Sequence, residues 1–205
     1  MYKKSDKDKI VLNIINNYSK TDDFDLLFKK SLKPVCGETI NIKRAQAFLS
    51  LYNLKDVILY FNNLIFNELR KQSKVILKNK KTTESIYILV VTRLSILNKF
   101  KSFSLRSKNY LLKAQNIFFS KKLLFEISDQ IWFLAGDKSL DMNFYSKRII
   151  LMKVYFLTFN FWLKDNSKDF LKTKDYLSRQ LQFVSKFGKY KFKLKQYLMK
   201  IKPKF

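Results

Sequence analysis

Hydrophobic residues recur at spacings of three and four along most of the chain, and this is the period of an α-helix. Between residues 54 and 69, for example, the apolar positions follow a 4-3-4-4 pattern. An acidic, turn-like stretch at 21–25 and two chain breakers, Pro34 and Gly37, separate the first helices from the rest. The pattern predicts helices over residues 10–18, 40–51, 54–69, 84–100, 109–119, 123–135, 143–163 and 167–187.

Composition supports an all-α fold. The 205 residues include only 3 Gly and 2 Pro, whereas sheet proteins need many tight turns built from those two residues. Hydrophobic residues make up 47% of the chain, which is enough to bury a core. We expect a helix-turn-helix-like part at 1–75, a helical bundle at 76–188 and a basic tail at 189–205.

Two of the expected helices, Ile40–Leu51 and Leu54–Leu69, meet at a tight corner, with Thr39 as a candidate cap for the first. This arrangement is compatible with a helix-turn-helix. The nearby cations are Lys43, Arg44 and Lys55, which are few for a DNA-reading element. An ordinary corner between two helices is the more common origin of such a pattern, and both interpretations stay open at this point.

The helix expected at Asn143–Leu163 is apolar on all sides. Asn143 is a candidate N-cap, and Gly136 stands where a left-handed C-cap would end the preceding helix. A helix that is apolar on all sides either lies in the centre of a core or faces an apolar ligand. Aromatic and methionine side chains can adapt to a flexible apolar tail. The candidate lipid-binding residues are Met152, Tyr155, Phe156, Phe159 and Trp162.

The tail alternates lysines with aromatic and aliphatic residues. Drawn as a helix, it gathers its apolar residues on one face and is flanked by lysines, which is typical of a helix lying in a membrane interface. The alternative is a solvated basic tail. The candidate membrane-contact residues are Tyr190, Leu194, Tyr197, Leu198 and Ile201.

The net charge of +26 favours an anionic partner such as a membrane, an acidic protein or nucleic acid. An AT-rich genome would also enrich lysine without any selection for binding. The chain has no histidine and a single cysteine, Cys36, so Ser-His, Cys-His and Glu-x-x-His sites are excluded. We therefore expect a protein that is not an enzyme and that has no metal or other cofactor.

The start of the chain indicates no signal or transit peptide, because Asp6 and Asp8 interrupt Met1–Lys9. Val154–Leu163 is an uncharged apolar run, but it is shorter than the roughly 20 residues that span a bilayer. We expect a cytoplasmic protein that lies peripherally on the inner membrane, on the matrix side if the host has mitochondria.

An ordered string of residues between 129 and 186 resembles a known family. The string reads Asp129-Gln130-Ile131-Trp132, Ala135-Gly136-Asp137-Lys138-Ser139, Asp141-Met142-Asn143-Phe144-Tyr145-Ser146-Lys147-Arg148, Leu151, Val154-Tyr155, Trp162-Leu163, Asp165, Ser167, Phe170, Thr173, Leu177 and Arg179. It is similar to the ninth Coq protein family, the lipid-binding accessory proteins of ubiquinone biosynthesis. Phe144 stands where that family usually has Trp, and Met142 where it usually has Phe.

The resemblance implies a fold like that of TetR regulators, with a helix-turn-helix that no longer binds DNA. It also implies a buried isoprenoid-binding cavity, a C-terminal amphipathic membrane helix and a partner, the demethoxyubiquinone hydroxylase. The family places the partner contact on the loop before the long apolar helix, where aromatic and charged residues adjoin. The candidate partner-binding residues are Asp141, Phe144, Tyr145 and Arg148.

Other interpretations of the sequence remain open. Asp137 and Asp141 could simply pair with Lys147 and Arg148 and cap the helix, with or without a partner contact. The charge is compatible with a helix-turn-helix regulator or a ribosome-associated protein, although a nucleic-acid partner is disfavoured because the expected second helix carries Asp56 and few cations. A structural subunit of a respiratory complex is a third hypothesis, and self-association into a homodimer is left open.

Overall fold

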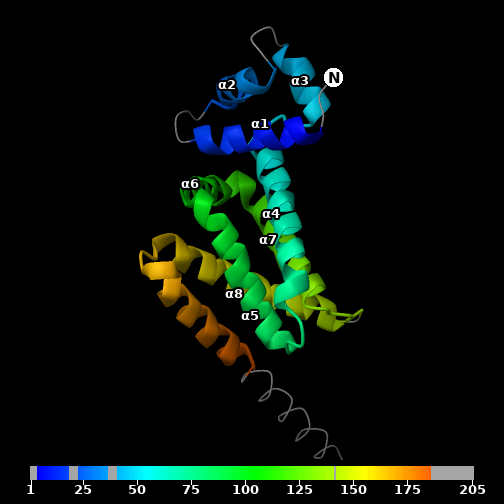
Figure 1. The fold of residues 1–205 in the computed structure, drawn as a ribbon, viewed down its shortest axis with the longest axis vertical. Coiled ribbons are helices and arrows are strands. Elements are labelled where there is room, and N and C mark those ends of the chain that lie inside the picture. Colours follow the sequence, from blue (N-terminus) through cyan, green and yellow to red (C-terminus); the bar gives the residue numbers. More distant parts are fainter. Residues whose placement is uncertain (1–3, 19–22, 37–40, 141, 186–205) are drawn as a thin grey trace, which may run out of the picture.

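The computed structural model describes residues 4–18, 23–36, 41–140 and 142–185. All regular secondary structure in these residues is helical, as the sequence predicts (Figure 1). The helices are α1 (Lys4–Asn17), α2 (Phe24–Cys36), α3 (Ile42–Leu49), α4 (Leu54–Ile76), α5 (Thr82–Leu97), α6 (Lys101–Leu111), α7 (Ile117–Leu134), α8 (Met142–Lys164) and a further helix at 171–185.

The helices form two groups joined by α4. Helices α1, α2 and α3 pack together at one end of the molecule (Figure 1). Helix α4 starts beneath α1 and runs down into a bundle with α5 and α7, and α8 packs on α5, α6 and α7. None of the helices within the described ranges combines the length and hydrophobicity that crossing a bilayer requires.

The corner between the third and fourth helices lies where the sequence places it. Ser50 ends α3 in the left-handed region, with φ of 50°, and Asn53 begins α4 through a capping box with Asp56. Helix α3, however, packs mainly on α2, while α4 leaves the corner and continues to Ile76. The expected pair at 40–69 is therefore a corner between two groups of helices, and its second helix runs beyond the predicted end at residue 69 to Ile76.

The hydrophobic pattern did not predict α2. Its first turn is held by Asp23, whose side chain accepts hydrogen bonds from the backbone N–H groups of Asp25 and Leu26. The acidic stretch that resembles a turn is thus in part an N-cap. Pro34 lies in the last turn of α2, where its missing backbone N–H costs the helix one hydrogen bond near its end.

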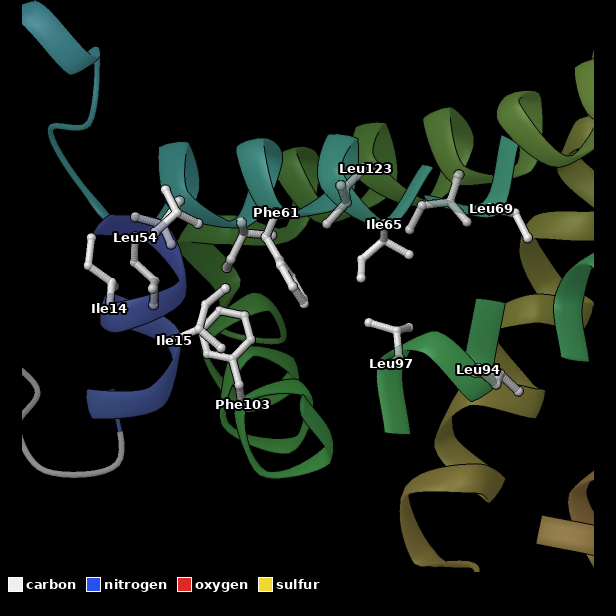
Figure 2. Close-up of a cluster of buried hydrophobic side chains, with 14 of the residues drawn as sticks. Ile14, Ile15, Leu54, Phe61, Ile65, Leu69, Leu94, Leu97, Phe103 and Leu123 are labelled. Carbon is white, nitrogen blue, oxygen red and sulfur yellow. The ribbon is translucent and has the colours of Figure 1, made fainter. Parts of the chain in front are cut away.

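The core follows the predicted apolar faces more closely. Side chains from α1, α4, α5, α6 and α7 converge in Figure 2, where Ile65 of α4 points toward Leu97 of α5. Phe61 meets Phe103 edge to face, with ring centres 5.4 Å apart. The helix expected at 109–119 is instead divided, because α6 ends at Leu111 and α7 begins at Ile117 after a short 3-10 turn. The resulting corner exposes one side of the core.

Candidate functional site

A cavity of about 120 Å³ lies between α4, α5, α6, α7 and α8. Its walls are mostly aliphatic and aromatic. Figure 2 shows five of the lining side chains, which come from four different helices: Phe61, Ile65, Leu97, Phe103 and Leu123. A dry apolar space of this size accommodates a group about as large as a benzene ring, since a cavity of about 150 Å³ binds benzene in another protein.

Three of the five residues predicted to bind lipid line this cavity. Tyr155, Phe156 and Phe159 occupy one side of α8 and face it. Trp162 lies outside the lining and is fully buried, with its ring centre 5.5 Å from that of Phe159. Met152 is half-buried and also lies outside the lining. The structure thus brings Tyr155, Phe156 and Phe159 together at the cavity and leaves Trp162 and Met152 outside its lining.

One wall of the cavity carries a buried polar network. The side chain of Arg93 donates from Nε to the hydroxyl of Tyr155 at 3.0 Å and from Nη2 to Oδ1 of Asn62 at 2.6 Å. Asn62 in turn donates to Glu126 at 3.1 Å, and Gln130 donates to the same carboxylate oxygen at 3.2 Å. The network ties α4, α5, α7 and α8 together around the cavity.

The lining reaches the surface at the corner between α6 and α7. Leu112 contributes to the cavity wall and is 48% exposed, and Lys108 beside it is half-buried. Arg93, by contrast, is 3% exposed. The cavity therefore has an inner polar end at Arg93 and an outer end near the α6–α7 corner.

A second cluster lies in the connection between α7 and α8. The Asp137 carboxylate accepts hydrogen bonds from Lys147 at 2.7 Å, Ser139 at 2.7 Å and Arg148 at 3.1 Å. Arg148 also donates to Asp129 at 2.6 Å. This is the pairing of Asp137 with Lys147 and Arg148 that the sequence left open. It fixes the two helices to each other at their connection.

The electrostatics of Asp137 reflect that pairing. Burial alone would raise the pKa of its carboxyl group, but the hydrogen bonds from Lys147, Ser139 and Arg148 outweigh burial and lower the pKa to about 2. Asp137 is therefore ionised throughout the physiological pH range, and it faces Lys147 and Arg148 together with a second carboxylate, Asp129.

Phe144 and Tyr145, the aromatic pair predicted to contact a partner, begin α8 directly above this cluster. Their rings meet nearly edge to face, with centres 5.1 Å apart. Tyr145 is 55% exposed, whereas Arg148 is 3% exposed and lies against the Phe144 ring. The structure thus gives Arg148 a supporting position beneath the surface. Asp141, the fourth candidate, lies outside the described residues.

Other large hydrophobic side chains near Tyr145 in the sequence are also exposed, at the end of α7, in the connection and in the first turns of α8. The sequence string contained Met142 but did not single it out as a contact, and the other neighbours were not predicted. We call this surface the α7–α8 patch, and it consists of Phe133, Leu140, Met142, Tyr145 and Ile149, all exposed. Met142, Tyr145 and Ile149 share one face of α8 because they are three and four residues apart, and exposed apolar residues on one face are typical of an interaction surface.

Helix α8 connects the patch with the cavity. Tyr145 of the patch and Tyr155 of the cavity wall are ten residues apart on one continuous helix. At a rise of 1.5 Å per residue this separation is about 15 Å. A single continuous helix therefore contributes to both the cavity wall and the patch.

The far end of α8 is anchored by Asp165. Its carboxylate accepts hydrogen bonds from the backbone N–H and hydroxyl of both Ser167 and Thr173, at 2.6–2.9 Å. Burial would raise the pKa of Asp165, but these hydrogen bonds outweigh it and hold the pKa well below its usual range. The predicted Asp-x-Ser motif is thus the turn that joins α8 to the helix at 171–185. The predicted membrane-contact residues at 190–201 lie outside the described residues.

The sequence model described as COQ9 matches residues 118–188, which contain α7, the Asp137 cluster, α8 and the Asp165 turn. This segment belongs to the COQ9 family. The match confirms the resemblance that the motif string at 129–186 indicated. The COQ9 segment thus holds the α7–α8 patch and the α8 wall of the cavity, while α4, α5 and α6 complete the cavity from outside it.

Curated relatives extend the similarity beyond the COQ9 segment. The mitochondrial ubiquinone biosynthesis protein COQ9 of Rattus norvegicus is 28% identical over 160 residues, covering 74% of this chain and 51% of the rat protein. COQ9-A of Xenopus laevis is 37% identical over 78 residues, which are 38% of this chain and 25% of the frog protein. The chain spans about half the length of the mammalian COQ9 proteins it matches.

The fold is similar to that of a TetR transcriptional regulator from Nitrosomonas europaea, with a TM-score of 0.68 over 87% of this chain and 97% of the regulator. This confirms the predicted TetR-like fold class. Sequence identity over that alignment is 14%, so the likeness concerns the fold alone.

Proposed function

We propose that this protein is a non-catalytic accessory protein of ubiquinone biosynthesis. In this proposal it binds an isoprenoid quinone intermediate in the cavity and presents it to the demethoxyubiquinone hydroxylase bound at the α7–α8 patch. The observation that supports this most directly is that α8 contributes both Tyr155, Phe156 and Phe159 to the cavity and Tyr145 to the patch. The names of the COQ9 relatives supply the pathway.

The cavity suits one end of an amphiphile. Its volume of about 120 Å³ holds a ring or one short stretch of a prenyl chain, so the remainder of a longer lipid must extend through the outer end near Leu112. Each methylene that leaves water contributes about 0.8 kcal/mol, so apolar contacts supply most of the affinity.

The α7–α8 patch suits a protein partner. Its exposed side chains are aromatic, aliphatic or methionine, the types enriched at the centre of protein interfaces. The ion pairs of Asp137 beneath it hold the patch in a fixed arrangement, which lowers the entropic cost of binding.

The proposed location is the surface of the inner membrane, where both the lipid and the hydroxylase would be met. The alternation of lysines with apolar residues in the tail sequence at 189–205 supports contact with anionic lipid. Lys108 lines the outer end of the cavity, and further lysines follow in the α6–α7 connection and the first turns of α7, at positions 113, 121 and 122. Both features favour a surface that approaches an acidic leaflet.

The experiment that tests lipid binding fills the cavity. Ser104 lines it and is buried, so Ser104→Phe places a phenyl ring in the space that the lipid would occupy. We expect wild type and a Ser104→Ala control to bind a short-chain ubiquinone analogue, with binding measured by fluorescence titration, and Ser104→Phe to bind it at least ten-fold more weakly. Binding by a folded Ser104→Phe variant with unchanged affinity would contradict the proposal.

A further inference from the structure

The inner end of the cavity is formed by Arg93, which the sequence analysis did not single out. We propose that the Arg93 guanidinium donates a hydrogen bond to an oxygen of the lipid head group, so that the head group lies at the inner end. This inference rests on the proposed lipid-binding function and specifies which part of the lipid is recognised.

The position of Arg93 is unusual for a charged residue. It is the one basic residue of α5, whose other residues are apolar apart from threonines, serines, a tyrosine and Glu84 at its start. The side chain is 3% exposed and faces a cavity whose walls are otherwise mainly apolar. Burial of a charged group is costly unless acceptors surround it.

The acceptors around Arg93 leave part of its donor capacity unused. A guanidinium has five N–H donors. Within the part of the chain that the structure describes, two acceptors bond to it, the Tyr155 hydroxyl and the Asn62 amide oxygen. Both acceptors are neutral, so no carboxylate is in direct contact with the cation among the described residues.

The carboxylate of this network does not contact Arg93 directly. Glu126 accepts hydrogen bonds from Asn62 and from Gln130, so Asn62 stands between the negative group and Arg93. A salt bridge designed for stability would place the carboxylate against the guanidinium. Here the direct partners are weaker acceptors, and the remaining donors are available to a ligand that enters the cavity.

A purely structural role is less consistent with this arrangement. Arg93 does join α4, α5 and α8 through its two hydrogen bonds, but apolar side chains in such a position usually give equal or greater stability. A cation at the inner end of an apolar cavity instead matches an amphiphile whose polar end carries oxygen acceptors. A quinone carbonyl on a ring that fits about 120 Å³ has this chemistry.

The test compares two lipids that differ only in the oxygenated ring. One is a benzoquinone with a two-unit prenyl chain, and the other is a prenyl hydrocarbon of matched size without oxygen. We expect wild type to prefer the quinone by about ten-fold or more, the effect of a hydrogen bond from a charged donor. Arg93→Met should abolish the preference while it still binds the hydrocarbon.

The matched control is Lys108→Met. Lys108 is the other cation that lines the cavity, but it is half-buried at the outer end. We expect Lys108→Met to keep the preference for the quinone. Loss of the preference in Lys108→Met with its retention in Arg93→Met would overturn the inference, because the head group would then lie at the outer end.

A spectroscopic measurement on wild type does not depend on the folding of any variant. A carbonyl that accepts a hydrogen bond from a guanidinium vibrates at lower frequency, so the infrared carbonyl band of the bound quinone should shift down relative to the quinone in hydrocarbon solvent. An unshifted band, or equal binding of both lipids by wild type, overturns the inference and leaves the proposed function standing. Failure of both lipids to bind overturns the proposed function as well.

Discussion

The guanidinium carbon of Arg148 lies 3.3 Å from the centre of the Phe144 ring, a close cation–π contact. The same side chain is paired with Asp129 and Asp137 and donates to the backbone carbonyl of Phe144. Arg148 therefore fixes the first turn of α8 from below. The Phe144 ring at the start of α8 is held in place within the protein itself, and under the proposed function this lowers the entropic cost of binding the partner.

The first prediction concerns the exposed member of the aromatic pair. Tyr145→Ala should weaken binding to the demethoxyubiquinone hydroxylase by about 2 kcal/mol, or roughly thirty-fold, as expected for an aromatic anchor near the centre of an interface. Its thermal stability should stay within about 0.5 kcal/mol of wild type because the side chain is exposed. Pull-down or surface plasmon resonance with the purified hydroxylase measures the change.

The matched control is Tyr52→Ala, because Tyr52 is equally exposed but lies in the corner between α3 and α4. It should bind the hydroxylase as wild type does. Equal affinities for both variants would place the contact elsewhere, and the addition of Phe144→Ala should weaken binding further if the pair acts together.

The second prediction concerns pH. The pKa of Asp137 is lowered from 3.8 to about 2 in the folded protein, so its ionised form favours the native state. This contribution is fully present above pH 3.8 and is lost as the pH falls through about 2. At 1.36 kcal/mol per pKa unit it amounts to about 2 kcal/mol. Urea unfolding of wild type and Asp137→Asn should therefore differ most at pH 6 and converge toward pH 2.

Asp175 is exposed and provides the comparison. Asp175→Asn should follow wild type across the whole pH range. A constant difference between wild type and Asp137→Asn from pH 6 to pH 2 would show that the carboxylate charge contributes nothing, and that the Asn variant loses stability through altered packing alone.

The features predicted best from the sequence are those set by residues close together in the chain, such as helix bounds and caps. The predicted helix at 143–163 agrees with α8 to within a residue at each end because its apolar period is unbroken over six turns. Gly136 has φ of +80°, the left-handed conformation expected after α7. By contrast, α2 was missed because Asp23 and Pro34 are typical turn residues, although Asp23 caps the helix and the helix packs on α1.

The cavity could not be predicted in the same way. Trp162 and Phe159 both fall on apolar faces of α8, and a periodic pattern cannot separate a side chain packed in the core from one that borders a space. That distinction depends on the volumes contributed by four other helices. Arg93 did leave a signal, since it is a lone cation within an apolar helix.

The third prediction concerns the tail at 189–205. A variant that ends at residue 188 should bind anionic liposomes at least ten-fold more weakly than the full chain, because each lysine near an acidic surface contributes about 1 kcal/mol. Replacement of the five lysines at 189, 191, 193, 195 and 200 by glutamine separates charge from the apolar face. Equal sedimentation of the truncated and full chains with phosphatidylserine vesicles would exclude a membrane role for the tail.

The last prediction compares two buried threonines. Thr173 donates its hydroxyl to Asp165 at 2.6 Å, so Thr173→Val should leave a buried carboxylate short of a donor and cost about 1–3 kcal/mol. The hydroxyl of Thr158 on α8 is buried with no hydrogen-bond partner in the described residues, so Thr158→Val should be neutral or stabilising. Urea unfolding at pH 7 measures both. The same side-chain change thus gives opposite results at two buried sites, and equal losses would show that Asp165 does not stabilise the turn through its hydrogen bonds.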